Sequence, residues 1–403
     1  MGAQEAQGQA VDRPEVDRQA PGARGADAAA DVPDPAVLAR LAALMEAAGL
    51  DAVVASSPDN ATYTLGVGIP SHRLIRERRV AVLVPRQGRP AVVAVTVEES
   101  FLQASVHGVD IVPYDEHGET AMQVLAGVVR ARGLDGARLG VELDFLPAQD
   151  HAELAALLPR ARLVDAAALF KRSRWIKTPR ERALIRRGGT LAEAAIRSAF
   201  EAAHPGMTER ELATRMAEAF LRRGGDTVQL VVVGAGERSS HPNAPPTDRP
   251  LRRGDVLRVD FLGTVGGYYT DCARTAVVGA PAPEHRRIWE AIAAIHREVL
   301  ARITPGVRTL DLYRLYHTRA EEHRLQPLRF LGHGLGLGLH EGPFLDRYTD
   351  IVLEPGMVFA IEPVHFVPHE VGFHLEDVLV VTEEGHELVT GGMDVGVLWQ
   401  IPG

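Results

Sequence analysis

The chain is poor in cysteine and in lysine. Cys272 is the single cysteine of the 403 residues. No disulfide can therefore form within one chain, and the sequence predicts a reducing compartment, the cytoplasm. Lysine occurs only at Lys171 and Lys177, and arginine supplies nearly all of the positive charge. Because the net charge is -9 and no basic run is present, the composition argues against nucleic-acid binding and against attraction to an anionic membrane.

Long apolar runs are also missing. No stretch reaches the about 18 residues that a membrane-spanning helix needs, and the first residues lack the apolar core of a signal peptide. Residues 1–32 are rich in Ala, Gly, Pro and charge, which is typical of a disordered tail. The remaining composition is ordinary for a globular protein, with 46% hydrophobic and 24% charged residues. The length predicts two domains.

Residues 33–170 are predicted to form an α/β domain. The domain begins with a helix that has Val37 and Leu41 on one face and Gly49 as its C-cap. Further helices alternate with short apolar strands, which are expected at residues 51–56, 79–85, 90–95, 109–114, 138–143 and 162–166. The turn between the second and third of these strands predicts a hairpin. Residues 56–66 are predicted to be a loop.

Residues 175–403 are predicted to form a second domain. Thr178 with Glu181, and Thr208 with Glu211, are two capping boxes, each of which marks the start of a helix. Two helices followed by strands occur twice along this domain. The pattern predicts two related halves packed as an α+β structure.

Acidic residues on the strands of the second domain indicate a cation site. Asp260 and Asp271 flank the residues 264–267, and a hairpin closing there would place the two aspartates opposite each other. Since like charges in that position destabilise a hairpin, the pair predicts a bound cation or a shared proton. The alternative is a surface hairpin with solvated aspartates, against which the apolar neighbours Val259 and Phe261 argue.

A second acidic pair follows later in the chain. Glu362 and Glu376 lie on expected strands that a broad connection joins. Two such pairs together with His333 suit two divalent ions with a bridging hydroxide. Because oxygen ligands dominate, the set favours manganese over a thiolate-type zinc site.

Glycine is unusually frequent between His333 and His340. Four glycines occur within seven residues from Gly332 to Gly338, although glycine weakens helices and strands. A flexible linker is one interpretation. The alternation of Gly with Leu, ending in His-Glu-Gly-Pro, favours a tight strand that holds two imidazoles beside a ligand.

Other reactive arrangements have little support. The chain has no Gly-x-x-x-x-Gly-Lys phosphate loop and no Gly-x-Ser-x-Gly elbow. Cys272 alternates with Asp271 along an expected strand, so its side chain should face away from the acidic site. A cysteine nucleophile is therefore not favoured.

The acidic and glycine-rich segments resemble the pita-bread metallopeptidases, in particular their Xaa-Pro aminopeptidases and dipeptidases. The four metal-site segments of that family are matched, in the same order, by residues 260–275, 332–343, 361–363 and 374–385. The resemblance extends from about residue 33 onward. It implies a creatinase-type N-terminal α/β domain followed by a pita-bread catalytic domain, a pseudo-twofold α+β fold.

The resemblance also assigns roles to single residues. The implied metal ligands are Asp260, Asp271, His333, Glu362 and Glu376. They would hold two divalent ions, with Mn²⁺ expected and Co²⁺ or Zn²⁺ as alternatives. His340 would lie beside the site, contact the substrate and donate to the developing oxyanion, and Glu376 would relay a proton. The implied activity is hydrolysis of the bond before proline, in Xaa-Pro dipeptides or in peptides with proline in second position, by a homodimer.

Two positions depart from the family pattern. A histidine usually occurs where this chain has Asn243, and His241 is the candidate to replace it. An arginine usually occurs where this chain has His374, which is expected on the same strand face as Glu376. Both departures concern residues that would face the substrate, while the five implied ligands are intact.

Two other functions stay open on this fold. One is a non-peptide C–N hydrolase or lyase acting on a small zwitterion, similar to ectoine hydrolases, creatinases or dimethylsulfoniopropionate lyases. Creatinases dispense with the metal, so the intact ligand set argues against that subtype. The other is a catalytically silent binding protein, a class that typically loses its ligands.

Overall fold

The computed structural model describes residues 32–403. The disordered tail predicted for residues 1–32 therefore lies, except for its last residue, outside the described residues. The N-terminal region comprises α1 (Pro35–Ala48), β1 (Ala52–Ala55), α2 (Pro58–Leu65), α3 (Pro70–Leu74), β2 (Ala81–Pro85), β3 (Ala91–Val95), η1 (Thr96–Glu98), α4 (Glu99–Ser105), β4 (Asp110–Tyr114), α5 (Ala121–Ala131), β5 (Arg138–Val141), α6 (Ala148–Leu157), β6 (Arg162–Asp165) and α7 (Ala167–Ser173).

The sheet of the N-terminal region has the order β4-β3-β2-β1-β5-β6. β2 runs antiparallel to β1 and β3, as the predicted hairpin requires, and the other neighbours are parallel. Successive residues of β1 pack on opposite faces: Val53 joins a core with Leu41 of α1, whereas Val54 joins a core with Leu125 of α5. The α/β architecture predicted here is confirmed.

The predicted loop at residues 56–66 is wrong, because this segment forms helix α2. Ser57 is the N-cap, and its hydroxyl accepts from the Asn60 amide. Pro58 occupies the first turn, where a proline removes no helical hydrogen bond. The residues that indicated a loop are therefore the ones that start the helix.

Local signals for helix ends are confirmed elsewhere. α1 ends at Gly49, which adopts a left-handed conformation with φ 63°. Both predicted capping boxes form, with Thr178 accepting from the Glu181 amide and Thr208 accepting from the Glu211 amide. None of the helices in residues 32–403 is long and apolar enough to span a membrane.

The C-terminal region contains two helix–strand groups. Its elements are α8 (Pro179–Ala202), α9 (Glu209–Arg222), β7 (Thr227–Ala235), η2 (Gly236–Ser240), β8 (Val256–Val265), β9 (Tyr268–Val278), α10 (Pro283–Arg302), α11 (Thr309–Glu322), β10 (Phe330–Gly334), β11 (Glu341–Asp346), β12 (Val358–Ile361), β13 (Val364–Val367), β14 (Val371–His374), β15 (Asp377–Val381), β16 (His386–Leu388) and β17 (Trp399–Ile401).

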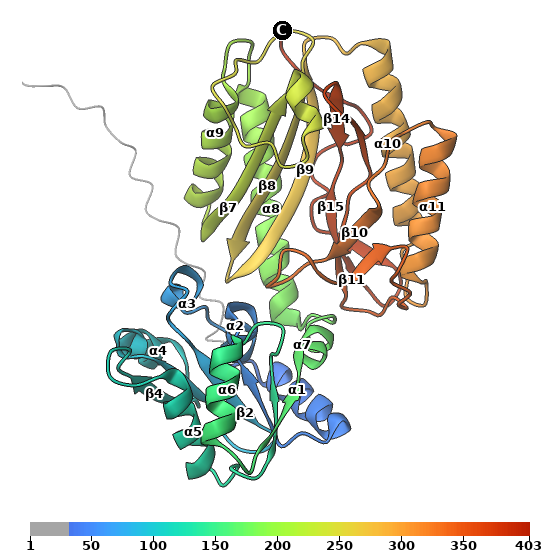
Figure 1. Ribbon diagram of the computed structural model, residues 1–403. Helices are drawn as coiled ribbons and strands as arrows, with labels where there is room; N and C mark the ends of the chain where they lie inside the picture. The colour runs from blue at the N-terminus through green and yellow to red at the C-terminus, as the bar shows by residue number, and fades with distance from the viewer. Residues whose placement is uncertain (1–31) are drawn as a thin grey trace, which may run out of the picture. The chain divides into compact units, whose positions relative to one another are not determined.

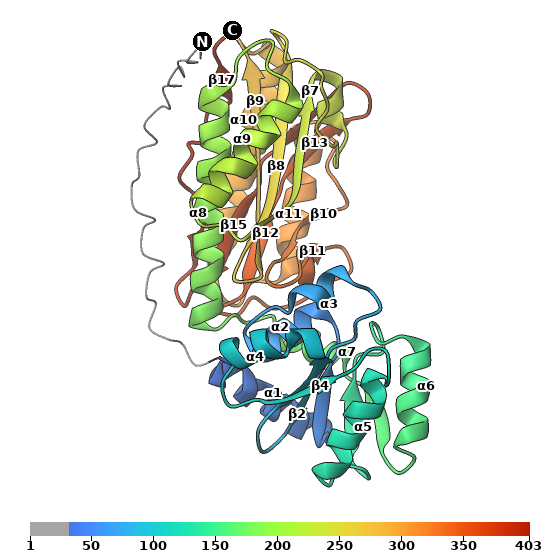
Figure 2. The same ribbon diagram turned by 90° about the vertical axis from the view of Figure 1, so that its left-hand side faces the viewer.

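Two sheets form the centre of the C-terminal region, with helices on the outside. The sheet β17-β9-β8-β7 is covered by α8 and α9, and the sheet β11-β10-β12-β15-β16 by α10 and α11 (Figure 1). The view of Figure 2 looks onto α8 and α9 with β7 and β8 behind them. The two sheets meet where the Glu376 amide donates to the Ala273 carbonyl at 3.1 Å. The predicted pair of related halves is confirmed as a fold, and the acidic segments lie at this junction.

The hairpin of β8 and β9 has a different register from the predicted one. It closes at a two-residue turn, Gly266 and Gly267, and not at the four residues 264–267. Both glycines have positive φ, 59° and 82°, as expected for the hairpin turn whose twist matches that of the strands. Asp260 therefore pairs with Ala273 and Asp271 with Leu262. The two aspartates are not opposite each other but lie diagonally on one face.

Candidate metal centre

The second acidic pair is aligned by two strand pairings that flank it. Ile361 pairs with Asp377 on one side, and Val364 pairs with His374 on the other. The same register places Glu362 opposite Glu376. These two glutamates lie between the strands, where the chain passes from β12 to β13 and from β14 to β15. The backbone is therefore held on both sides while the carboxylates point to one place.

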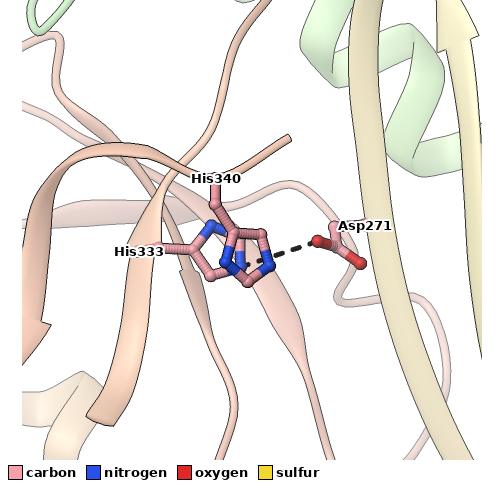
Figure 3. Close-up of side chains that lie close together, drawn as sticks. All are labelled: Asp271, His333 and His340. Atoms are coloured by element: carbon pink, nitrogen blue, oxygen red, sulfur yellow. Dashed lines mark ion pairs between the residues drawn. The ribbon is translucent and has the colours of Figure 1, made fainter. Parts of the chain in front are cut away.

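One cavity brings the implied ligands together. It is lined by all five, namely Asp260, Asp271, His333, Glu362 and Glu376. Four of them are buried, and Asp260 is partly exposed. His333 Nε2 lies 3.3 Å from Glu362 Oε1 and 3.6 Å from Asp271 Oδ2. Figure 3 shows the contact between His333 and Asp271.

Several polar atoms in this cavity have no hydrogen-bond partner among residues 32–403. They are Asp260 Oδ1, Glu362 Oε1, Glu376 Oε2, His333 Nε2, both ring nitrogens of His374 and Arg258 Nη1. The other ring nitrogen of His333, Nδ1, lies 3.0 Å from the Gly334 carbonyl oxygen. That contact keeps the proton on Nδ1 and leaves the Nε2 lone pair free, which is the usual arrangement of a metal-binding histidine. Unpaired carboxylate oxygen and imidazole nitrogen atoms that converge in this way fit a bound cation.

The carboxylates cannot all be charged here without a cation. Burial, followed by the charge of Asp260, raises the pKa of Asp271 well above its usual range. Burial and then Asp271 do the same to the pKa of Glu376. Burial alone would also raise the pKa of Glu362, but the neighbouring imidazoles of His333 and His374 lower it to about 2. A buried group of like charges is stable only when a cation balances it, and divalent ions bound by oxygen ligands would do so.

His340 lies directly over His333. The two imidazole rings are stacked, with centroids 3.7 Å apart and an interplanar angle of 18° (Figure 3). A ring nitrogen of His340 also lies within 4.8 Å of ligand atoms of Asp271 and His333. Burial, followed by the neighbouring His333, lowers the pKa of His340 to about 4, so its imidazole is neutral at neutral pH. Its contact with substrate stays a prediction.

The continuous strand predicted between His333 and His340 is wrong. β10 ends at Gly334, a loop follows, and β11 returns antiparallel to β10. Glycine is required where the strands approach each other closely. A Cβ atom on Gly332 would lie 2.1 Å from the Ala360 carbonyl oxygen, and one on Gly334 would lie 2.6 Å from the Glu341 carbonyl oxygen.

The start of β11, next to His340, is fixed by a buried ion pair. Lys177 Nζ donates to Glu341 Oε1 at 2.7 Å, and the Lys177 side chain is 1% exposed. A salt bridge in so dry an environment is costly to break. It therefore fixes the backbone immediately after the His340 imidazole.

His374 contacts both glutamates of the site. Its Nε2 atom lies 3.3 Å from Glu362 Oε2 and 3.8 Å from Glu376 Oε2. The sequence predicted proximity to Glu376 on one strand face. In the structure β14 ends at His374 and β15 begins at Asp377, so the two side chains approach each other across a break. The contact with Glu362 was not predicted, because it depends on the pairing of β13 with β14.

The candidate replacement histidine does not line the cavity. His241 is exposed, and its ring lies 5.9 Å from that of His369. Asn243, at the position where the family has a histidine, is among the lining residues. A catalytic role of His241 stays a prediction, and the geometry favours Asn243 as the residue nearer the reaction.

Two further side chains on β8 and β9 lie on opposite sides with respect to the cavity. Cys272 faces the apolar core with Phe200 and Phe220, away from the carboxylates, as the strand alternation predicted. Arg258 lines the cavity and was missed. The available signal was its position two residues before Asp260, which puts both side chains on one face of β8.

Comparisons with known proteins identify the family of this chain. Residues 183–383 match the model of metallopeptidase family M24, and residues 38–176 match that of the creatinase/prolidase N-terminal domain. A probable dipeptidase, PepE, of Mycobacterium tuberculosis is 32% identical over 376 residues, covering 88% of this chain and 97% of the relative. An Xaa-Pro dipeptidase of Lactobacillus helveticus is 29% identical over 349 residues, covering 84% and 92%.

A solved structure is similar in the same way. The dipeptidase PepE from Mycobacterium ulcerans has a TM-score of 0.78 and 30% identity, covering 91% of this chain and 97% of that structure. The chain therefore belongs to metallopeptidase family M24. It combines a creatinase-type N-terminal domain with a pita-bread metallopeptidase fold, as the resemblance predicted.

Proposed function

We propose that the protein hydrolyses the bond before proline in Xaa-Pro dipeptides, with peptides that have proline in second position as further substrates. The observation that best supports this activity is the buried set of carboxylates with unpaired oxygen atoms in a single cavity. The cavity has a volume of about 310 Å³, which suits a small ligand. The relatives named as dipeptidases support the substrate class.

The residues around the cavity have separate tasks in this proposal. Divalent ions, when bound, supply a Lewis acid and lower the pKa of a water molecule. Asp260, Asp271, His333, Glu362 and Glu376 would hold the ions. The neutral imidazole of His340 would donate a hydrogen bond to the oxyanion that develops on the substrate carbonyl. Glu376 Oε2, which has no other partner among residues 32–403, would take up a proton and deliver it to the leaving nitrogen.

The proposal extends to the metal, the assembly, the location and the domain limits. Manganese is favoured by a ligand set of four carboxylates and one imidazole, with cobalt or zinc as alternatives. A homodimer is proposed from the family resemblance. A cytoplasmic location is proposed from Cys272, the single cysteine of the chain. The proposed domain limits are 33–170 and 175–403.

One observation favours a second candidate, a non-peptide hydrolase of a small zwitterion. His374 replaces the arginine expected in peptidases of this family, and Arg258 adds a positive charge elsewhere in the cavity. The positions of His374 and Arg258 would suit a ligand whose shape differs from that of a peptide. A silent binding protein is not favoured, because all five implied ligands line the cavity.

The test compares substrates on protein loaded with Mn²⁺. The panel contains Xaa-Pro dipeptides, Xaa-Pro-Xaa tripeptides, Xaa-Ala dipeptides and creatine, and Asp271→Ala prepared in the same way controls for contaminating peptidases. We expect hydrolysis of Xaa-Pro dipeptides that chelation abolishes. Turnover of creatine without dipeptide hydrolysis would replace the proposal with the second candidate.

A further inference from the structure

Arg258 is a fully buried guanidinium on the wall of the candidate metal centre. It belongs to β8, it is 0% exposed, and it lines the same cavity as Asp260 and His374. Its Cζ atom lies 5.3 Å from the centre of the Phe366 ring, and Phe366 also packs near His374, with ring centroids 6.4 Å apart. Arg258, Phe366 and His374 thus form one side of the cavity.

The hydrogen bonds of Arg258 do not balance its charge. Nε donates to the Ser239 carbonyl at 3.0 Å, and Nη2 donates to the Pro242 carbonyl at 2.7 Å and to the His241 carbonyl. All three acceptors are neutral. Nη1 has no hydrogen-bond partner in residues 32–403. No carboxylate of the described residues forms an ion pair with this guanidinium within 4.0 Å, and the carboxylate charges that act on it from farther away are those of Asp260 and Glu376.

Another buried arginine shows what this chain does when such a charge is structural. Arg274 Nη2 is 2.6 Å from Asp377 and 3.0 Å from Glu193, both of which are buried. A buried cation without such partners is costly. Arg258 therefore has an unsatisfied donor where a small ligand would bind, and its charge is met only from beyond ion-pair distance, by Asp260 and Glu376.

We propose that Arg258 binds the free carboxylate of the substrate and makes the site selective for ligands that have one. The proposal rests on the proposed function. Arg258 would supply the positive charge that family members have as an arginine at the position of His374. A guanidinium suits a carboxylate because its planar fork matches the two oxygens. Arg258 and Asp260 are two residues apart on one face of β8, which corresponds to about 7 Å along a strand. That separation leaves room for a single residue between the cleaved bond and the carboxylate.

A purely structural role is the alternative. Arg258 holds three carbonyls of residues 239–242, and this segment leads to Asn243 in the cavity. Loss of that anchor would impair the site for every substrate. A carboxylate receptor, in contrast, would affect only ligands that have the carboxylate. The two roles are separated by comparing an acid with its neutral amide.

The kinetic experiment measures kcat/KM for Ala-Pro and for Ala-prolinamide on Mn²⁺-loaded protein. We expect wild type to prefer the acid and Arg258→Met to lose that preference by roughly 10- to 100-fold, the range for a hydrogen bond to a charged group. Arg258→Lys should retain part of it, because the charge remains while the fork is lost. If Arg258→Met does not fold, the reduced preference of Arg258→Lys is the deciding result.

The matched control is Arg238→Met. Arg238 donates to the Pro245 carbonyl at 2.6 Å and pairs with Glu209 at 3.0 Å, so it also holds this part of the chain, but it does not line the cavity. Loss of the Arg238 side chain should change kcat/KM for both substrates by the same factor. The proposal would be overturned if Arg258→Met kept the wild-type preference for Ala-Pro, that is, if kcat/KM fell by the same factor for Ala-Pro and for Ala-prolinamide.

A binding experiment keeps the two proposals separable. Calorimetric titration of proline and of prolinamide into the Mn²⁺-loaded protein measures recognition without turnover. We expect wild type to bind proline at least ten-fold more tightly than prolinamide. We expect Arg258→Met to bind proline and prolinamide with equal affinity. Equal binding of both ligands to wild type would contradict the role of Arg258. Absence of dipeptide hydrolysis would instead contradict the proposed function, while this titration would still decide the role of Arg258.

Discussion

Two buried acidic clusters lie back to back on the same strands of the C-terminal region. Glu376 points into the metal centre, whereas Asp377, the next residue, points to the other side and binds Arg274 at 2.6 Å and Thr390 at 2.7 Å. β9 alternates in the same way, with Asp271 facing the cavity and Arg274 facing the opposite cluster. We refer to Glu193, Arg274 and Asp377 as the Arg274 cluster.

The clusters differ in where their positive charge comes from. Burial alone would lower the pKa of Arg274, but Asp377 and Glu193 raise it above its usual value. The carboxylates of the metal centre have His333, His374 and Arg258 nearby, but the pKa values of Asp271 and Glu376 still rise with burial and mutual repulsion. In the Arg274 cluster the chain itself supplies the cation that pairs with the carboxylates. In the metal centre, cations bound from solution would balance the remaining negative charge. The Arg274 cluster therefore stabilises the fold, whereas the metal centre creates a binding site.

The largest effect on stability is expected from Arg274→Met. The change leaves Glu193 and Asp377 buried without their cation, so the free energy of unfolding should fall by about 3–5 kcal/mol. Urea denaturation with and without Mn²⁺ measures it, and the metal should not rescue the loss. The control is Arg186→Met, which removes the exposed pair with Glu387 and should cost less than about 1 kcal/mol. Similar losses in both variants would abolish the distinction between the clusters.

Asp271→Ala should lose metal binding and activity and keep its stability, in contrast to Arg274→Met. Removing this one carboxylate of the cavity should eliminate bound metal and turnover together, while the metal-free protein stays folded because the Arg274 cluster is intact. Metal content by mass spectrometry should be close to two ions per wild-type chain and much lower in the variant.

Thermal unfolding of the same two proteins provides a second check. Mn²⁺ should raise the Tm of wild type, since a ligand that binds only the folded state stabilises it, and should leave that of Asp271→Ala unchanged. Full activity of a metal-free wild-type preparation would contradict the assignment of these carboxylates.

His340→Ala should lower kcat by roughly 10² or more with bound metal retained, as expected for the loss of an oxyanion donor. Steady-state kinetics and metal analysis of one preparation test both parts. If the variant loses metal instead, His340 is a ligand, which its position within 4.8 Å of the other ligand atoms would allow.

The smallest effects are expected in the segment between η2 and β8. Since Asn243 lines the cavity and His241 is exposed, Asn243→Ala should lower kcat/KM several-fold and His241→Ala should change it little. A deleted hydrogen bond of this kind is worth about 1 kcal/mol. A larger loss in His241→Ala would show that His241 moves into the cavity when substrate binds.

The sequence predicted features that depend on local chemistry. The capping boxes at Thr178 and Thr208 form because a side chain and an amide three residues apart are sufficient for them. The five implied ligands, which line one cavity, could be predicted because each lies in a short motif. The hairpin register was missed because residues 264–267 contain two possible turns, and the conformation of Gly266 and Gly267 decides between them.

Features that depend on distant segments were not predictable in the same way. The sequence predicts that Arg258 lies on a strand but does not indicate what surrounds its side chain. In the structure its hydrogen-bond acceptors are neutral carbonyls of residues 239–242. The contact of His374 with Glu362 requires the pairing of β13 with β14. Single-sequence patterns describe neighbours along the chain, whereas both contacts are made across the fold.

The buried pair of Lys177 with Glu341 has a practical consequence for chemical labelling. Lys177 and Lys171 are the only lysines of the chain, and their side chains are 1% and 59% exposed. An amine-reactive dye should therefore modify Lys171 and spare Lys177 while the protein is folded. Native labelling would place one fluorophore on a lysine side chain at a known position in α7, and labelling of Lys177 would report that the buried pair beside His340 has opened.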